Sequence, residues 1–314
     1  MQAVATVVTL FSLLFPTKTW FAPDQPWTVQ VRPAQGQPSD VTLVLTDFSG
    51  RVIESHGANE ISGEKTVDLK DLFVPVSTPG TYVLWAVPKG SALPVFAGTP
   101  LVIEVRRDTR RDAPAGPMVM KVEPLAYAVL TTDRGEMTVA FYYDDAPHTV
   151  ANFLGLSAAG FYDGLNFHRV IEGFIIQGGD PRGDGTGGPG YTIDAEFSDN
   201  EMREGVIAMA RQGDPLEAQG AMPRYEFANS AGSQFFVCLN YDRTKQLDRR
   251  YTAFGKVIDG FDVAQAIAKA PVAQGDRPKE PQVIRKVRVF PVEPAKNPYR
   301  GFFEVNMPKP TSQP

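Results

Sequence analysis

The chain has 314 residues, enough for two domains, and its 43% hydrophobic and 21% charged residues exclude wholesale disorder. Its formal net charge of −5 argues against a general nucleic-acid binder, because such a protein needs a basic face to neutralise phosphates. The single cysteine, Cys238, excludes an intrachain disulfide and a zinc site built from cysteines.

The first residues admit two interpretations. The apolar run from Val4 to Phe15 has the length of a signal-peptide core, but no Lys or Arg precedes Lys18 and no Ala-x-Ala site follows. The alternative is a first β-strand that Pro16 ends. We expect the strand and a cytoplasmic protein; an exported or periplasmic protein is the alternative if residues 1–15 act as a signal. No stretch reaches the ~18 consecutive apolar residues of a membrane span.

Residues 1–106 alternate between apolar and polar side chains in several short segments. Residues 41–46 alternate and end at a turn, 81–87 read as a strong strand, and 101–105 close the set. Strands at this spacing with no convincing helix predict an antiparallel, immunoglobulin-like β-sandwich. We expect this domain to be an accessory module that binds a protein partner.

Residues 107–119 are charged and then rich in Pro and Gly, which predicts a solvated linker. An anion-binding patch of arginines is the alternative, but Asp108 and Asp112 dilute its charge. At the other end, residues 291–314 form a Pro-rich tail.

Residues 120–290 predict a second domain. Segments 126–132 and 136–142 form a hairpin, and a helix that Asp145 caps follows it. Further strands and a second helix around Val263 and Ile267 bring the total to eight strands and two helices. This count predicts a closed antiparallel β-barrel capped by two helices.

Six blocks in this domain carry the functional signal: Phe167–Asp180, Gly185–Gly188, Ala208–Arg211, Ser230–Phe236, Leu247–Asp248 and Tyr251–Val257. Their order and spacing resemble the cyclophilin family of peptidyl-prolyl cis-trans isomerases, in its bacterial branch, over about residues 127–289. The resemblance implies an enzyme that accelerates X–Pro rotation in unfolded or flexible polypeptides. The first domain is not covered by it.

The resemblance also implies a site. Its catalytic residues would be Arg169, Gln177, Phe174 and Phe236, and its substrate-binding residues Ile175, Ala210, Arg211, Gln234, Leu247 and Tyr251. Arg169 would donate to the prolyl nitrogen of the twisted amide, over an apolar pocket for the proline ring. Taken singly, Phe174, Phe236 and Leu247 are typical of barrel core, and His168 is best read as structural.

The reaction breaks no bond to a heavy atom, so we expect no cofactor and no metal. Gln246 stands where many eukaryotic relatives have Trp, which predicts weak cyclosporin binding because an indole supplies packing and an N–H donor. The segment 212–228 is longer than usual and is expected near the substrate groove.

Two other patterns are decoys. Gly183, Gly185 and Gly188 match a dinucleotide fingerprint, but Pro189 follows where a helix should begin, so a loop is expected. Asp194, Glu196 and Asp199 are expected to form a solvated acidic loop. The alternatives to an isomerase are a non-catalytic module that binds proline peptides and a chaperone module recruited through the first domain.

Overall fold

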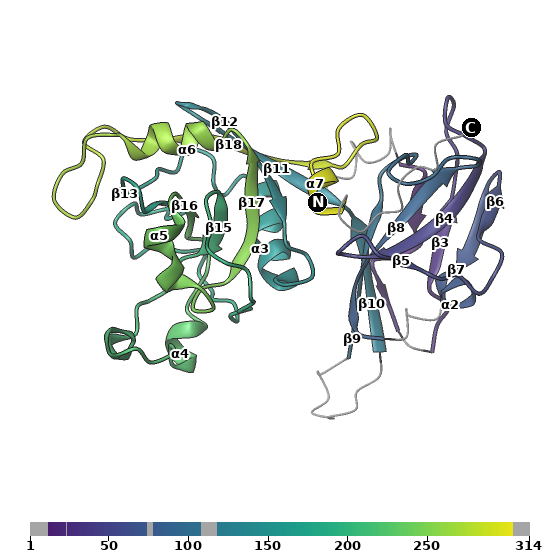
Figure 1. Ribbon diagram of the computed structural model, residues 1–314, viewed down its shortest axis with the longest axis horizontal. Coiled ribbons are helices and arrows are strands. Elements are labelled where there is room, and N and C mark those ends of the chain that lie inside the picture. The colour runs from purple at the N-terminus through teal and green to yellow at the C-terminus, as the bar shows by residue number, and fades with distance from the viewer. Residues whose placement is uncertain (1–11, 23, 74–77, 108–117, 304–314) are drawn as a thin grey trace. The chain divides into compact units, whose positions relative to one another are not determined.

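The strands gather into three sheets. The computed structural model describes residues 12–22, 24–73, 78–107 and 118–303, and of 302 and 303 only the backbone (Figure 1). The chain divides into two units, one holding Tyr127–Phe290 and the other Gln2–Ala126 with Pro291–Pro314. Each unit has its own apolar core, and the fold is mainly β, as predicted. No helix within these described ranges has both the length and the apolarity to cross a bilayer.

The N-terminal unit contains two sheets. The smaller has the order β1 (Leu14–Pro16), β3 (Thr28–Val31), β7 (Lys65–Asp68). The larger has the order β2 (Trp20–Phe21), β10 (Met118–Pro124), β9 (Leu101–Arg107), β8 (Gly80–Pro88), β4 (Asp40–Asp47), β5 (Val52–Ile53), and β6 (Glu60–Ser62) also pairs with β4. Inward side chains of both sheets share one buried cluster that includes Val29, Val31, Leu43, Leu45 and Ile103. A sandwich accounts for this arrangement, and its immunoglobulin-like topology stays a prediction.

Most of the expected linker, residues 108–117, lies outside the described residues, as do residues 4–11 of the expected first strand. β10 contains Met118 and Val119, which are expected in the linker, and residues 120–124, which are expected in the second domain. They join the first unit because β10 pairs with β9 along its whole length. The tail returns to the same unit, where α7 (Arg300–Phe303) follows Tyr299, whose hydroxyl donates to the Ala126 carbonyl at 2.5 Å. A short helix, α2 (Leu69–Leu72), completes this unit.

The C-terminal unit is built on one eight-stranded sheet. Its order is β13 (Arg169–Ile171), β14 (Ile175–Gly178), β16 (Phe235–Cys238), β15 (Val206–Met209), β17 (Ala253–Asp259), β12 (Gly135–Phe141), β11 (Ala126–Thr132), β18 (Ile284–Pro291). The strand count and the first hairpin are as predicted.

The predicted closure of the barrel is wrong, because the sheet is strongly curled but open. Within the described residues β13 and β18 are not paired as strands. The residues just before β13 approach β18 through an isolated bridge between Asn166 and Val283 and a few backbone hydrogen bonds, such as that from the Ile284 N–H to the Leu165 carbonyl at 2.8 Å. Beside β13 the chain runs as a loop instead, and the carbonyl of Asp276 in this loop accepts the Val170 N–H at 2.8 Å.

Both predicted helices are present. α3 (Pro147–Ala158) packs against β17, and α6 (Phe261–Ala268) packs against β12, β13 and β14 (Figure 1). Shorter helical turns lie in the connections: η2 (Pro215–Gln219), α4 (Tyr225–Ala228), α5 (Tyr241–Thr244) and η3 (Lys245–Leu247).

The predicted N-cap of α3 is wrong. Ala146 is the N-cap and makes no side-chain capping bond, while Asp145 accepts a hydrogen bond from Asn200. The Glu196 carboxylate caps the helix from a distant loop by accepting the N–H groups of His148 (3.0 Å) and Thr149 (2.8 Å). It fills the place of a local cap because the first N–H groups of a helix have no partner within the helix.

Candidate active site

A row of directly opposed residues crosses five strands of the curled sheet. Arg169 on β13 faces Gln177 on β14, Gln177 faces Phe236 on β16, and Phe236 faces Ala208 on β15. Ala208 in turn faces Ala253 on β17. Directly opposed residues in a sheet project to the same face, so this row places Arg169 on the same face as Phe236, with Gln177 between them.

The two faces of the sheet bury different aromatic clusters. Phe235 packs edge-on against Phe153 and Tyr162 under α3, with ring centroids 5.6 and 5.7 Å apart. Phe236, the next residue, points to the other face because successive strand residues alternate. It therefore leaves the core under α3 and joins a second cluster.

This second cluster gathers predicted site residues into one apolar patch. Ile175 and Phe236 are buried in it, and Phe174, Ala210, Leu247 and Tyr251 pack against it while partly exposed. We call these six residues the socket. Cys238 lies in the same cluster, and burial raises the pKa of its thiol, so it stays protonated and apolar there.

Two glutamines form the polar side of the socket. Gln177 Nε2 donates to Gln234 Oε1 at 3.0 Å. Gln234 Nε2 donates in turn to the carbonyls of Gly185 (3.1 Å) and Gly187 (2.8 Å). Gln234 thus fixes the glycine-rich loop to the sheet, and it also orients the side chain of Gln177. No helix follows this loop, so the dinucleotide fingerprint is a decoy, as expected.

Arg169 lies at the edge of the row. Its Nε donates to Asp276 Oδ2 at 3.3 Å, and its side chain is 42% exposed. Within the described part of the chain, the terminal Nη1 and Nη2 groups make no hydrogen bond. They are therefore open to a substrate at the socket.

The predicted substrate contact of Arg211 is through its backbone and stays a prediction, while its side chain is engaged within the protein. Its side chain is only 2% exposed and forms a two-pronged ion pair with Glu217, at 2.7 and 3.0 Å. The guanidinium carbon lies 4.2 Å from the centroid of the Tyr251 ring. The Arg211 side chain supports Tyr251, and only its backbone could reach a bound peptide.

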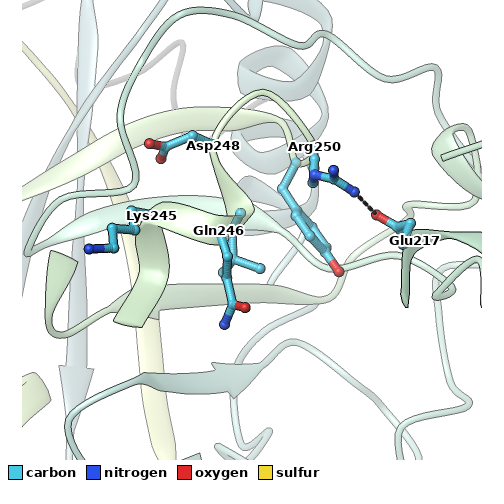
Figure 2. A pocket seen from close by; sticks show the side chains of 7 residues that line it. Glu217, Lys245, Gln246, Asp248 and Arg250 are labelled. Carbon is cyan, nitrogen blue, oxygen red and sulfur yellow. Dashed lines mark ion pairs between the residues drawn. The ribbon is translucent and has the colours of Figure 1, made fainter. Parts of the chain in front are cut away.

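A cavity of about 520 Å³ adjoins the socket and shares Leu247 and Tyr251 with it (Figure 2). Its other walls are polar: Glu217, Lys245, Gln246, Asp248 and Arg250. Glu217 comes from the long 212–228 segment, so this segment lies beside Leu247 and Tyr251 of the socket. Within the described residues no group of three or more His, Cys, Asp or Glu is arranged to hold a metal ion.

Sequence reasoning missed two residues of this site. Asp276 holds Arg169 but lies 107 positions away in a loop with no recognisable motif. Glu217 stands in the long segment, and its only sequence signal is its place three residues after Asp214, where it completes a capping box.

Comparison with known protein families shows which family this chain belongs to. The model of the family described as cyclophilin type peptidyl-prolyl cis-trans isomerase/CLD matches residues 127–289, which is more than half of the chain. The chain belongs to the cyclophilin family. The match coincides with the C-terminal unit and contains every residue of the socket.

Individual cyclophilins resemble the same part of the chain. A peptidyl-prolyl cis-trans isomerase of Synechococcus elongatus is 45% identical over 135 residues, covering 43% of this chain and 82% of its own length. Peptidyl-prolyl cis-trans isomerase A of Mycobacterium tuberculosis is 40% identical over 187 residues, covering 53% of this chain and 94% of its own length. A crystal structure of a Cryptosporidium parvum cyclophilin, obtained in the presence of the dipeptide Ala-Pro, is 31% identical, with a TM-score of 0.46, and covers 52% of this chain and 98% of that one. The family match and the sequence relatives make the C-terminal unit a cyclophilin-type isomerase domain.

Proposed function

We propose that Arg169 is the residue through which this isomerase lowers the barrier to X–Pro rotation. The barrier of ~18–20 kcal/mol arises because rotation breaks amide resonance. In the twisted amide the prolyl nitrogen regains a lone pair, which the planar amide lacks. A fixed donor aimed at that nitrogen stabilises the transition state more than the ground state, and such selective binding is catalysis.

The observation that carries this proposal is the row Arg169–Gln177–Phe236. It sets a permanently charged donor on the same face of the sheet as the most buried aromatic ring of the socket, with Gln177 between the two. The ion pair to Asp276 uses Nε, so the two terminal nitrogens can turn toward a substrate.

The socket supplies the second requirement, which is a place for the proline ring. Burial of an apolar ring against Phe236, Ile175 and Leu247 fixes the substrate beside Arg169 without polar contacts that would resist rotation. The adjoining cavity of about 520 Å³ leaves room for residues that flank the proline. We therefore propose proline-containing segments of unfolded or flexible polypeptides as substrates.

The test is Arg169→Ala in the full chain, followed by NMR exchange on a proline tetrapeptide. We expect kcat/KM to fall about a hundredfold, as for other single donors that stabilise a transition state. Arg288→Ala is a matched control, because Arg288 on β18 is also 42% exposed and also ion-paired with an aspartate, Asp163. Unchanged turnover in Arg169→Ala would refute the role of Arg169, whereas peptide binding without any turnover by the wild type would support the non-catalytic module.

A further inference from the structure

The 212–228 segment is a folded structure held by a buried aspartate. The Asp214 side chain is fully buried and accepts hydrogen bonds from Arg224 Nε (2.8 Å) and the Arg224 N–H (2.9 Å). It also caps η2 by accepting the Leu216 N–H at 3.0 Å. The clasp between Asp214 and Arg224 closes the segment, so its residues have defined positions.

Glu217 is where this segment meets the site. Its Oε1 accepts from Arg211 Nη2 at 2.7 Å, and its Oε2 accepts from Arg211 Nη1 at 3.0 Å. Oε2 also accepts the Asp214 N–H at 3.1 Å. A two-pronged carboxylate–guanidinium pair fixes the plane of the guanidinium as well as its position.

The Tyr251 ring lies against the guanidinium group of Arg211. The Arg211 guanidinium lies over the Tyr251 ring at 4.2 Å, and the ring meets Phe236 edge-on at 5.5 Å. Arg211 is further fixed by Nε and Nη2, which donate to the Arg250 carbonyl at 3.1 and 3.0 Å. A continuous series of contacts therefore links Glu217, through Arg211 and Tyr251, to Phe236 in the socket.

We propose that Glu217 is a positioning residue of the isomerase, which sets the Tyr251 wall of the socket through Arg211. This inference rests on the proposed function, since it assigns a task to the same socket. Tyr251 contacts the substrate equally in the planar and twisted states, because the proline ring does not leave the socket during rotation. Loosening Tyr251 therefore weakens binding of both states and raises KM while kcat is retained.

The segment is tied to the same wall a second time. Arg250 Nη1 donates to the Ala221 carbonyl at 2.6 Å, and its Nη2 donates to the Gly220 carbonyl at 3.1 Å. Figure 2 shows Glu217 and Arg250 as an ion pair at the edge of the cavity. The segment thus acts on the substrate groove through defined contacts.

The test compares Glu217→Gln and Glu217→Ala with the wild type in the full chain. Steady-state parameters come from NMR exchange over a series of tetrapeptide concentrations. We expect KM to rise about tenfold in Glu217→Ala and less in Glu217→Gln, with kcat within about twofold of the wild type. The matched control is Glu226→Gln, which removes an exposed carboxylate of the same segment that pairs with Arg224 and does not reach Arg211.

A second readout reports on Tyr251 directly. The protein is labelled with fluorotyrosine, and the Tyr251 resonance among the ten tyrosines is assigned from Tyr251→Phe. We expect this resonance to shift or broaden in both Glu217 variants and to stay in place in Glu226→Gln. A folded Glu217 variant with unchanged KM, or with a lower kcat alone, would overturn the proposal, and so would an unchanged Tyr251 resonance.

The two proposals fail in different ways. If the wild type does not accelerate exchange, the proposed function fails. The Tyr251 resonance and the Kd for the same tetrapeptide then still decide the role of Glu217. If the wild type is active and only the Glu217 effects are missing, the positioning role alone is refuted.

Discussion

Arg169 Nε lies 3.3 Å from Asp276 Oδ2, and more than two-fifths of each side chain is exposed. An exposed ion pair of this kind contributes only about 0–1 kcal/mol to stability. Its effect is on the orientation of the guanidinium, because the pair holds Nε and so aims the two terminal nitrogens. We therefore expect the loss of Asp276 to lower the activity while it leaves the stability almost unchanged.

We predict that Asp276→Asn lowers kcat and kcat/KM by the same factor, about threefold to tenfold, because an unheld donor must be ordered in each transition state. The thermal midpoint should change little. NMR exchange on a proline tetrapeptide gives both constants. Asp133→Asn is the control, since Asp133 forms an exposed ion pair with Arg285 on another strand. A rise in KM at constant kcat would contradict this role for Asp276.

We predict that Glu196→Ala destabilises the C-terminal unit by about 1–2 kcal/mol, the usual cost of losing a helix cap. Its carboxylate accepts two backbone N–H groups at the start of α3 and the Thr149 hydroxyl at 2.7 Å. Glu196→Gln should lose less, since one acceptor oxygen remains. Amide hydrogen exchange of α3 measures the effect, and Asp199→Asn, in an exposed pair with Arg249, should leave it unchanged. Equal protection of α3 in Glu196→Ala would show that the cap is dispensable.

Six of the predicted site residues gather in one apolar cluster, while their catalytic and binding roles stay predictions. Phe235 and Phe236 are adjacent and both buried, so composition alone reads β16 as plain core. The family resemblance singled out Phe236 for the pocket, and the sequence analysis made no assignment for Phe235. Local patterns of this kind survive folding because strand alternation fixes which face each residue occupies.

The predictions failed at positions whose structure depends on a residue far away in the sequence. Asp145 has the residue type of an N-cap, yet Glu196 takes that task from a loop 48 positions beyond His148. Nor does the pattern around Arg211 indicate that its side chain is buried in an ion pair with Glu217. The closed barrel failed for the same reason, since the loop that carries Asp276 takes the place of a strand partner beside β13.

His168 gives the C-terminal unit a pH-dependent stability. Burial lowers the pKa of its imidazole, the Asp180 carboxylate opposes this shift, and the charge of Arg169 adds to it. Neither ring nitrogen has a hydrogen-bond partner in the described part of the chain. Since the pKa in the unfolded chain is about 6.5, the unfolded state takes up the proton first as the pH falls. Stability is thus complete above pH ~6.5 and declines below it until the folded pKa is reached.

We predict that His168→Phe removes this decline. Hydrogen exchange at Val170 and Ile176 between pH 7.5 and 5 measures the stability of the C-terminal unit. Tryptophan fluorescence does not report on this unit, because Trp20, Trp27 and Trp85 all lie in the N-terminal unit. His56→Gln, at an exposed position of the N-terminal unit, should behave as the wild type does. A wild-type unit equally protected at both pH values would contradict the prediction.

We expect Gln246 to set the affinity of the C-terminal unit for cyclosporin. Its side chain lines the cavity next to Leu247 and Tyr251, and its Nε2 donates to the Arg243 carbonyl at 3.1 Å (Figure 2). The exposed amide offers a ligand little apolar area, whereas an indole would add an apolar face and an N–H donor at the same wall. We predict weak binding by the wild type and a Kd about tenfold lower or better in Gln246→Trp, which corresponds to ~1.4 kcal/mol.

Gln246→Leu separates the two contributions of the indole. It adds apolar area without a donor, so its affinity should fall between those of the wild type and Gln246→Trp. Isothermal titration of the three proteins gives the constants, and tetrapeptide turnover should differ by less than about twofold among them, because Gln246 is not in the row that faces the prolyl nitrogen. Wild-type affinity equal to that of Gln246→Trp would show that the cavity binds the inhibitor without this side chain.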